Sequence, residues 1–170
     1  IQPDQTAKLA VVTQTTLSVD DAADITAAVK ARFPAIREPK QQDICYATQN
    51  RQDAVKLLSG QVDVVIVVGS PTSSNSNRLR EVARKLGTEA YMIDSADELQ
   101  AAWVQGKARV GVTAGASAPD ILVRQVVERL KALGAVAVRK LDGIQEAVKF
   151  PLPKGLKLEG AAEVNLEHLR

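Results

Sequence analysis

The sequence repeats one pattern three times: a short apolar run, a loop rich in serine, threonine or glycine, and an amphipathic helix. The three apolar runs span residues 9–12, 62–68 and 108–112. Strands that alternate with helices of about 10–15 residues are typical of a parallel, doubly wound sheet. We therefore predict an α/β fold with three layers, in which helices cover both faces of parallel sheets.

Apolar residues at helical spacing follow each loop. In the second and third copies they recur at i, i+3, i+4 and i+7, which marks the apolar face of a helix. The spacing predicts helices that end near Phe33, Leu86 and Leu133, and another helix over residues 50–59. A shorter strand and helix are expected within residues 90–104.

Local signals predict where these helices begin and end. Gly60, Gly87 and Gly134 follow helices at positions where a left-handed residue is often needed. Ser95 and Ser117 each precede an acidic residue by three positions, as in a capping box. We expect both serines to cap the helices that follow them.

The loop from Ser70 to Asn77 is the first candidate binding site. Seven of its eight residues carry a hydroxyl or an amide, which is more than one helix cap needs. Ligands of parallel sheets bind beyond the carboxyl ends of the strands, where helix N-termini attract anions. No Walker or dinucleotide fingerprint is present. A diphosphate or sugar phosphate is therefore the expected ligand. Ser18 and Ser117 lie in the other two loops, and each of them, taken alone, is interpreted as a helix cap.

Composition removes several function classes. One cysteine and one histidine, Cys45 and His168, exclude an intramolecular disulfide and a Cys/His zinc site. A net charge of +2 without a basic cluster argues against a nucleic-acid partner. No apolar run approaches the roughly 18 residues of a membrane span.

Cys45 is the second candidate, and three interpretations of it stay open. It precedes a predicted helix, and a helix N-terminus favours the thiolate. A lone cysteine is otherwise often a small buried hydrophobe. Cys45 and Arg51 also share the Cys-x5-Arg spacing of cysteine phosphatases, but no glycine lies between them.

Four segments taken together are similar to motifs of the LytB/IspH family, in order and at matching spacing over about residues 8–155. They are residues 13–19, 43–52, 69–79 and 112–120. The resemblance implies an enzyme of the non-mevalonate isoprenoid pathway. Such an enzyme reductively removes the hydroxyl of 4-hydroxy-3-methylbut-2-enyl diphosphate and gives isopentenyl and dimethylallyl diphosphate.

The resemblance also implies roles for individual residues. Family members have three pseudo-symmetric α/β domains around a [4Fe-4S] cluster, and Cys45 matches one of its three cysteine ligands. Thr15 matches the threonine beside the substrate hydroxyl. The residues that match the diphosphate-binding positions are Ser73, Ser74, Asn75 and Ser117.

The same resemblance implies that this chain is a C-terminal part, inactive alone, because the family's other cluster cysteines, its histidines and its catalytic glutamate precede these motifs. The start at Ile1 rather than methionine agrees with that expectation. Residues 1–42, with a linker at 34–42, would end the second domain, residues 43–134 would form the third, and residues 135–170 would be a strand and tail.

The expected partners are the missing N-terminal half and an electron donor such as flavodoxin or ferredoxin, in a bacterial cytoplasm, with no nucleic acid and no membrane. A cluster-free module that binds phosphate or diphosphate is the alternative.

Overall fold

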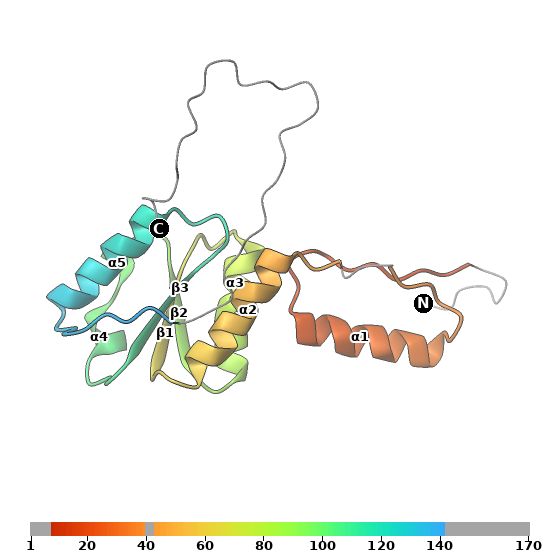
Figure 1. Cartoon of the computed structure of the whole chain (residues 1–170), viewed down its shortest axis with the longest axis horizontal. Coiled ribbons are helices and arrows are strands. Elements are labelled where there is room, and N and C mark those ends of the chain that lie inside the picture. The colour runs from red at the N-terminus through yellow and green to blue at the C-terminus, as the bar shows by residue number, and fades with distance from the viewer. Residues whose placement is uncertain (1–7, 40–42, 142–170) are drawn as a thin grey trace, which may run out of the picture.

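The computed structural model describes residues 8–39 and 43–141 and contains a three-stranded parallel sheet (Figure 1). Strand β1 (Val64–Val68) lies between β2 (Glu89–Ile93) and β3 (Val110–Ala114). All five β1 residues are buried, as expected for a central strand with both faces covered. The apolar run that was predicted as a strand thus forms the centre of the sheet.

Helices cover both faces of this sheet, which confirms the predicted three-layer α/β architecture. Helices α2 (Tyr46–Ser59) and α3 (Ser74–Lys85) pack on one face, and α4 (Ala101–Val104) and α5 (Asp120–Ala132) on the other (Figure 1). Alternate β1 side chains enter the two cores. The first core includes Val55, Val65, Val67, Leu79 and Val82, and the second includes Val64, Ile66, Val68, Val126 and Leu130.

Two predicted strands are absent from the described residues. Residues 9–12 form only one isolated parallel bridge, between Ala10 and Arg37, on either side of α1 (Val19–Arg32). Arg37 falls within the predicted linker, so that segment is partly paired. Residues 135–138 are not a strand either. A strand needs neighbours to satisfy its backbone, and neither segment finds a ladder in the described part of the chain.

Several helix ends differ from prediction. Gly87 and Gly134 have the expected positive φ of 82° and 110°, but Gly60 is right-handed with a φ of −74°. Helix α2 begins four residues earlier than expected. The helix predicted after Ser95 is divided into a short 3-10 helix, Ala96–Glu98, and α4, and the Ser95 side chain caps neither.

The extended segment and tail predicted after residue 141 lie outside the described residues. Within the described residues, no helix is both long and apolar enough to cross a membrane.

Candidate functional site

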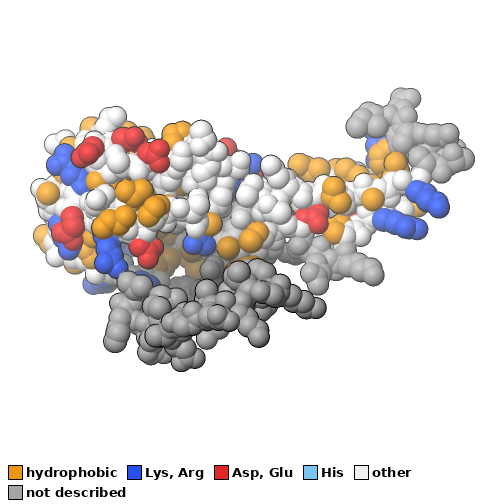
Figure 2. Space-filling model, turned by 90° about the horizontal axis from the view of Figure 1, so that it is seen from above, with side chains coloured by type: hydrophobic (Ala, Val, Ile, Leu, Met, Phe, Trp, Pro, Cys, Tyr) orange, Lys and Arg blue, Asp and Glu red, His pale blue; other side chains and the backbone are white. Residues whose placement is uncertain are grey.

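Helices α2, α3 and α5 all begin at the carboxyl edge of the sheet, which faces upward in Figure 1. The middle of this face consists mostly of uncharged polar side chains and backbone in Figure 2, while charged side chains lie mainly toward its ends. Helix N-termini carry unsatisfied N–H groups and a partial positive charge. This edge can therefore attract an anion without a cluster of lysines or arginines.

Two glycines allow the N-terminus of α3 to approach the strand ends closely. Gly69 follows β1, and a Cβ there would lie only 2.7 Å from the Cβ of Ser76. Gly115 follows β3, donates its N–H to Val68 O over 3.0 Å, and would also collide with Ser76 if it carried a Cβ. The loops after β1 and β3 therefore meet at the first turn of α3.

Most polar side chains in the loop after β1 hold the loop itself together. Ser73 caps α3, because its Oγ accepts the Ser76 N–H over 3.3 Å and the Ser76 hydroxyl over 3.0 Å. The Asn77 amide donates to the carbonyls of Pro71 and Ser73. Five of the seven polar side chains make such local bonds: Ser70, Thr72, Ser73, Ser76 and Asn77.

Ser74 and Asn75 are the remaining two. Ser74 is exposed, whereas Asn75 is only 8% exposed and neither atom of its buried amide has a hydrogen-bond partner. A buried polar group without a partner costs about 1–3 kcal/mol. This amide lies at a helix N-terminus, where an anion can accept a hydrogen bond from its nitrogen and a ligand hydroxyl can donate one to its oxygen.

Ser117 lies on the neighbouring loop, two residues after Gly115. The prediction that Ser117 caps α5 was wrong, because Pro119 is the N-cap residue and no side chain caps this helix. Ser117 is exposed, and the Asn75 amide nitrogen lies 3.8 Å from where a Cβ of Gly115 would be. Ser18 does act as predicted, since its Oγ accepts the Asp21 N–H at the start of α1.

The other two predicted site residues, Thr15 and Cys45, are neighbours. The Cys45 N–H donates to Thr15 O over 3.1 Å, and both residues are exposed. Cys45 is the N-cap residue of α2, and its side chain caps nothing. The interpretation of Cys45 as a buried hydrophobe is therefore wrong.

The phosphatase interpretation also fails. Arg51 lies inside α2, and the residues between Cys45 and Arg51 form the first turns of that helix. A phosphate cradle of that class needs those residues in a loop whose N–H groups point at the ligand, and a helix directs them along its axis instead.

A polar pocket of about 360 Å³ lies between residues 13–18, the first loop, and the loop after β1. Gln14, Thr16 and Leu17 line one side of it. Residues of the loop after β1 and of α3 line the other side, among them Ser74, Arg78 and Glu81. The structure therefore brings the neighbours of Thr15 to the same pocket as Ser74. Ser117 does not line this pocket, but it lies on the loop of Gly115, which packs close to the Asn75 amide.

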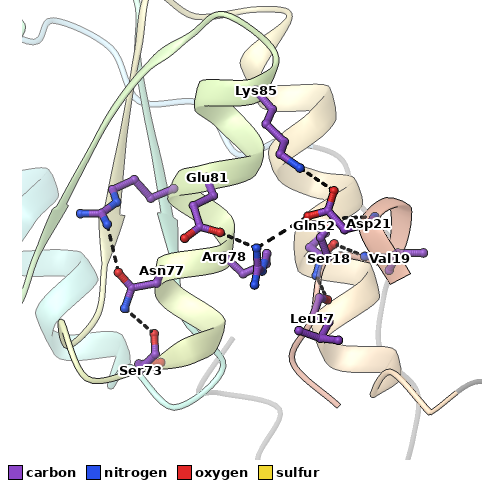
Figure 3. Close-up of polar contacts among 11 residues, drawn as sticks. Leu17, Ser18, Val19, Asp21, Gln52, Ser73, Asn77, Arg78, Glu81 and Lys85 are labelled. Carbon is purple, nitrogen blue, oxygen red and sulfur yellow. Dashed lines mark hydrogen bonds and ion pairs between the residues drawn. The ribbon is translucent and has the colours of Figure 1, made fainter. Parts of the chain in front are cut away.

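Ion pairs join α1 to α3 beside this pocket (Figure 3). Asp21 contacts Lys85 over 2.5 Å and Arg78 over 3.8 Å, and Arg78 also pairs with Glu81. The hydrogen bond from Lys85, helped by the charges of Lys85 and Arg78, holds the pKa of Asp21 below its ordinary value. The cations beside the pocket are therefore partly neutralised.

The described residues do not form a complete metal site. Across residues 8–39 and 43–141, no three His, Cys, Asp or Glu side chains come together as donors. Cys45 is the free thiol of this region.

Sequence reasoning missed Asp43 and Gln52, which hold the first loop. Asp43 accepts the Thr13 N–H, and Gln52 bonds to Leu17 and Val19. A usable signal existed for Gln52, because it lies on the buried face of α2, three residues before Val55, where an apolar residue is expected.

Known proteins resemble this chain over most of its length. A family model described as LytB protein matches residues 1–131. The chain belongs to the LytB family. Among curated LytB relatives, the 4-hydroxy-3-methylbut-2-enyl diphosphate reductase of Polaromonas sp. strain JS666 is 77% identical over 94% of this chain and 48% of its own length. The enzyme of the same name from Bordetella pertussis is 61% identical over 98% of this chain and 51% of its own length.

Solved structures of the family match as well. The E-1-hydroxy-2-methyl-but-2-enyl-4-diphosphate reductase from Plasmodium falciparum superposes with a TM-score of 0.81 at 31% identity, over 91% of this chain and 49% of that one. A second structure, described as the terminal enzyme of the non-mevalonate pathway, has a TM-score of 0.51 at 34% identity, over 74% of this chain and 44% of that one. This LytB chain spans about half the length of the relatives it matches.

Proposed function

We propose that this chain forms the diphosphate-binding part of a 4-hydroxy-3-methylbut-2-enyl diphosphate reductase. The observation that supports it most is the buried, unpartnered amide of Asn75 at the N-terminus of α3. That amide needs a polar partner, and the edge of the sheet attracts anions. The names of the relatives supply the substrate.

In this proposal the diphosphate accepts hydrogen bonds from the Ser74 and Ser117 hydroxyls, the Asn75 amide and the first N–H groups of α3. Ser73 fixes that helix end as its cap and lies within reach of the same anion. Hydrogen bonds to a charged group contribute about 1.5–3 kcal/mol each. Three or four of them contribute about 5–12 kcal/mol in total, a range that includes the about 8 kcal/mol of a micromolar site.

Thr15 and Cys45 serve the reacting end of the substrate in this proposal. Thr15 lies beside the substrate hydroxyl, and its carbonyl is held by the Cys45 N–H. Cys45 is exposed at the N-terminus of α2, so its sulfur is accessible to a metal.

The chain alone does not fit an iron–sulfur cluster. A cubane is normally held by several thiolates, and the described residues offer one. Cys45 therefore fits the role of one ligand among several, with the others in the half that this sequence does not contain. When bound in the complete protein, a [4Fe-4S] cluster would supply the electrons for removal of the hydroxyl.

The domain arrangement follows from the same proposal. Residues 1–42 would complete a second α/β domain and residues 43–134 would be the third. Residues 135–170 would be a strand and a tail, with the tail against the missing first domain. Flavodoxin or ferredoxin as electron donor, and a cytoplasmic location, stay predictions of the resemblance.

Titration calorimetry with inorganic diphosphate tests the proposed site on this chain as it stands. We expect micromolar binding that Asn75→Ala and Ser117→Ala each weaken about tenfold or more, because each loses a hydrogen bond to an anion. Ser95→Ala is the matched control, since Ser95 follows β2 at the same edge but lies outside the site. Absence of binding by a normally folded chain would contradict the proposal, as would an unchanged affinity of Asn75→Ala.

The alternative, a cluster-free diphosphate-binding module, is favoured by the single thiol. It predicts the same titration result but no reductase activity after the chain is restored to the length of its relatives. Activity of that restored chain therefore separates the two functions.

A further inference from the structure

The backbone of the first loop, which carries Thr15, is held at every second residue by one short stretch of chain. Thr13 N–H donates to the Asp43 carboxylate over 2.7 Å, and Thr15 O accepts the Cys45 N–H over 3.1 Å. Farther along, Leu17 and Val19 both bond to Gln52. The loop thus runs along the start of α2 and is fixed at four points.

Gln52 makes the last two of these contacts with a single side chain (Figure 3). Its Nε2 donates to Leu17 O over 2.8 Å, and its Oε1 accepts the Val19 N–H over 3.0 Å. The residue is completely buried, and both of its partners lie more than thirty positions earlier in the chain. One amide therefore joins the first loop and the start of α1 to α2.

The chemistry of this contact requires a primary amide of this length. One partner is a carbonyl that needs a donor, and the other is an N–H group that needs an acceptor. A glutamate carboxylate at position 52 would place an oxygen against Leu17 O, and a methionine would satisfy neither group. Because the site is buried, water cannot easily replace the lost bonds.

We infer that Gln52 is a positioning residue for the proposed reaction, which holds the loop so that Thr15 stays in register with Cys45. The inference rests on the proposed function only for its effect on the reaction. Gln52 touches neither Thr15 nor Cys45 through its amide, so it acts through the backbone of Leu17 and Val19. Loss of its two bonds frees Leu17 and Val19 from α2, so that only the more exposed pair of Asp20 with Lys56 links the described residues after Thr15 in this segment to α2.

Amide hydrogen exchange of this chain, followed by NMR, tests the structural half of the inference. In Gln52→Met we expect exchange at the Val19 and Cys45 N–H groups to rise about tenfold or more, while exchange at β1 rises less. If Gln52 only stabilises the fold, its replacement should accelerate exchange at β1, Val19 and Cys45 by one common factor. That result would overturn the inference.

Gln61→Met is the matched control, because the Gln61 amide also donates to a backbone carbonyl but is exposed at the far end of α2. It should leave the Val19 and Cys45 amides unchanged. If Gln52→Met does not fold, exchange at the Cys45 N–H alone is followed in Gln52→Glu, whose ionised carboxylate keeps an acceptor for Val19 and loses the donor to Leu17. Protection at Cys45 that persists in a folded Gln52 variant would refute the inference.

Kinetics of the chain restored to the length of its relatives test the functional half. We expect Gln52→Met to lower kcat about tenfold to a hundredfold with little change in KM, because the diphosphate contacts lie on α3 and the loop after β3. An active parent chain whose kcat is unaffected by Gln52→Met would refute the positioning role alone. An inactive parent chain would instead count against the proposed function, and the exchange experiment would still decide the structural claim.

Discussion

Single glycines decide how closely α3 approaches the strand ends. Gly69 and Gly115 both face Ser76, whose side chain is almost fully buried between them. Neither glycine has a positive φ, so space rather than backbone conformation requires them. The position of the Asn75 amide, one residue before Ser76, depends on this close approach.

Replacement of Gly115 by alanine tests that dependence. We expect Gly115→Ala to lower the free energy of unfolding by about 1–3 kcal/mol, because the new methyl group overlaps Ser76 in a packed interior. Urea unfolding followed by circular dichroism measures the change.

Gly60→Ala provides the comparison for that experiment. A Cβ at Gly60 would meet nothing closer than Leu57 O at 3.8 Å, and its φ of −74° suits alanine. The substitution should therefore raise the free energy of unfolding by about 0.4–1 kcal/mol. Equal stability of the two variants would contradict the packing argument.

The sequence was informative about residue types and less so about their partners. It predicted a polar, anion-binding loop, and it predicted correctly that Ser18 caps a helix. It could not tell which hydroxyls of the loop bond within it, because those bonds depend on the turn that the backbone makes. The Ser117 cap failed for a similar reason: Pro119 lies at the cap position, and the capping-box spacing does not register it.

At the scale of elements, α1 is attached mainly by polar contacts. Ala22 is its one buried residue among those described, and Ile25 is 59% exposed. Asp20 pairs with Lys56 of α2, and Asp21 pairs with Lys85 of α3. Exposed ion pairs are individually weak, so this attachment should respond to pH and salt.

The pH response follows from Asp21, whose pKa is held low mainly by the hydrogen bond from Lys85. A carboxyl with a lower pKa in the folded state stabilises that state above its unfolded pKa, and the contribution is lost as pH falls through the folded value. We expect Asp21→Asn to reduce the free energy of unfolding by about 1 kcal/mol or less at pH 7. The difference from wild type should be smaller at pH 3, because the contribution is lost as the pH falls from the unfolded pKa through the lowered folded pKa.

Urea titrations at both pH values measure this difference, with Asp24→Asn as control. Asp24 is exposed on the same helix, one turn away from the contact with α3. A destabilisation by Asp21→Asn that is equally large at pH 3 and pH 7 would show that the ion pairs do not attach α1.

Elements with many local apolar residues were predictable, and those that depend on distant partners were not. The run that became β1 is apolar throughout and lies at the centre of the sheet. Residues 9–12 have a similar composition but find only the bridge from Ala10 to Arg37, because strand formation depends on neighbours that local sequence does not reveal. The division of the helix predicted after Ser95 into a 3-10 helix and α4 was not predicted either. The spacing of Ser95 and Glu98 is that of a capping box, although the Ser95 side chain caps no helix.

At the scale of the whole molecule, the carboxyl edge of the sheet carries the proposed diphosphate site, and Cys45 lies at the same edge, at the start of α2. The chain spans about half the length of its relatives, and its described residues contribute a single thiol. Sequence motifs were enough to predict the family, because four of them occur in order. They could not reveal that the first loop is held by Asp43 and Gln52, which requires the three-dimensional packing.

The central claim is that this chain supplies Cys45 and the diphosphate site to a complete reductase. The most direct test restores the chain to the length of its relatives, purifies it without oxygen, and measures iron content together with turnover of 4-hydroxy-3-methylbut-2-enyl diphosphate, for wild type and Cys45→Ser. We predict that wild type binds iron and reduces the substrate, whereas Cys45→Ser folds but loses its cluster and its activity. A Cys45→Ser variant that retains full iron content and activity, or a folded wild-type protein that does not reduce this substrate, would contradict the account.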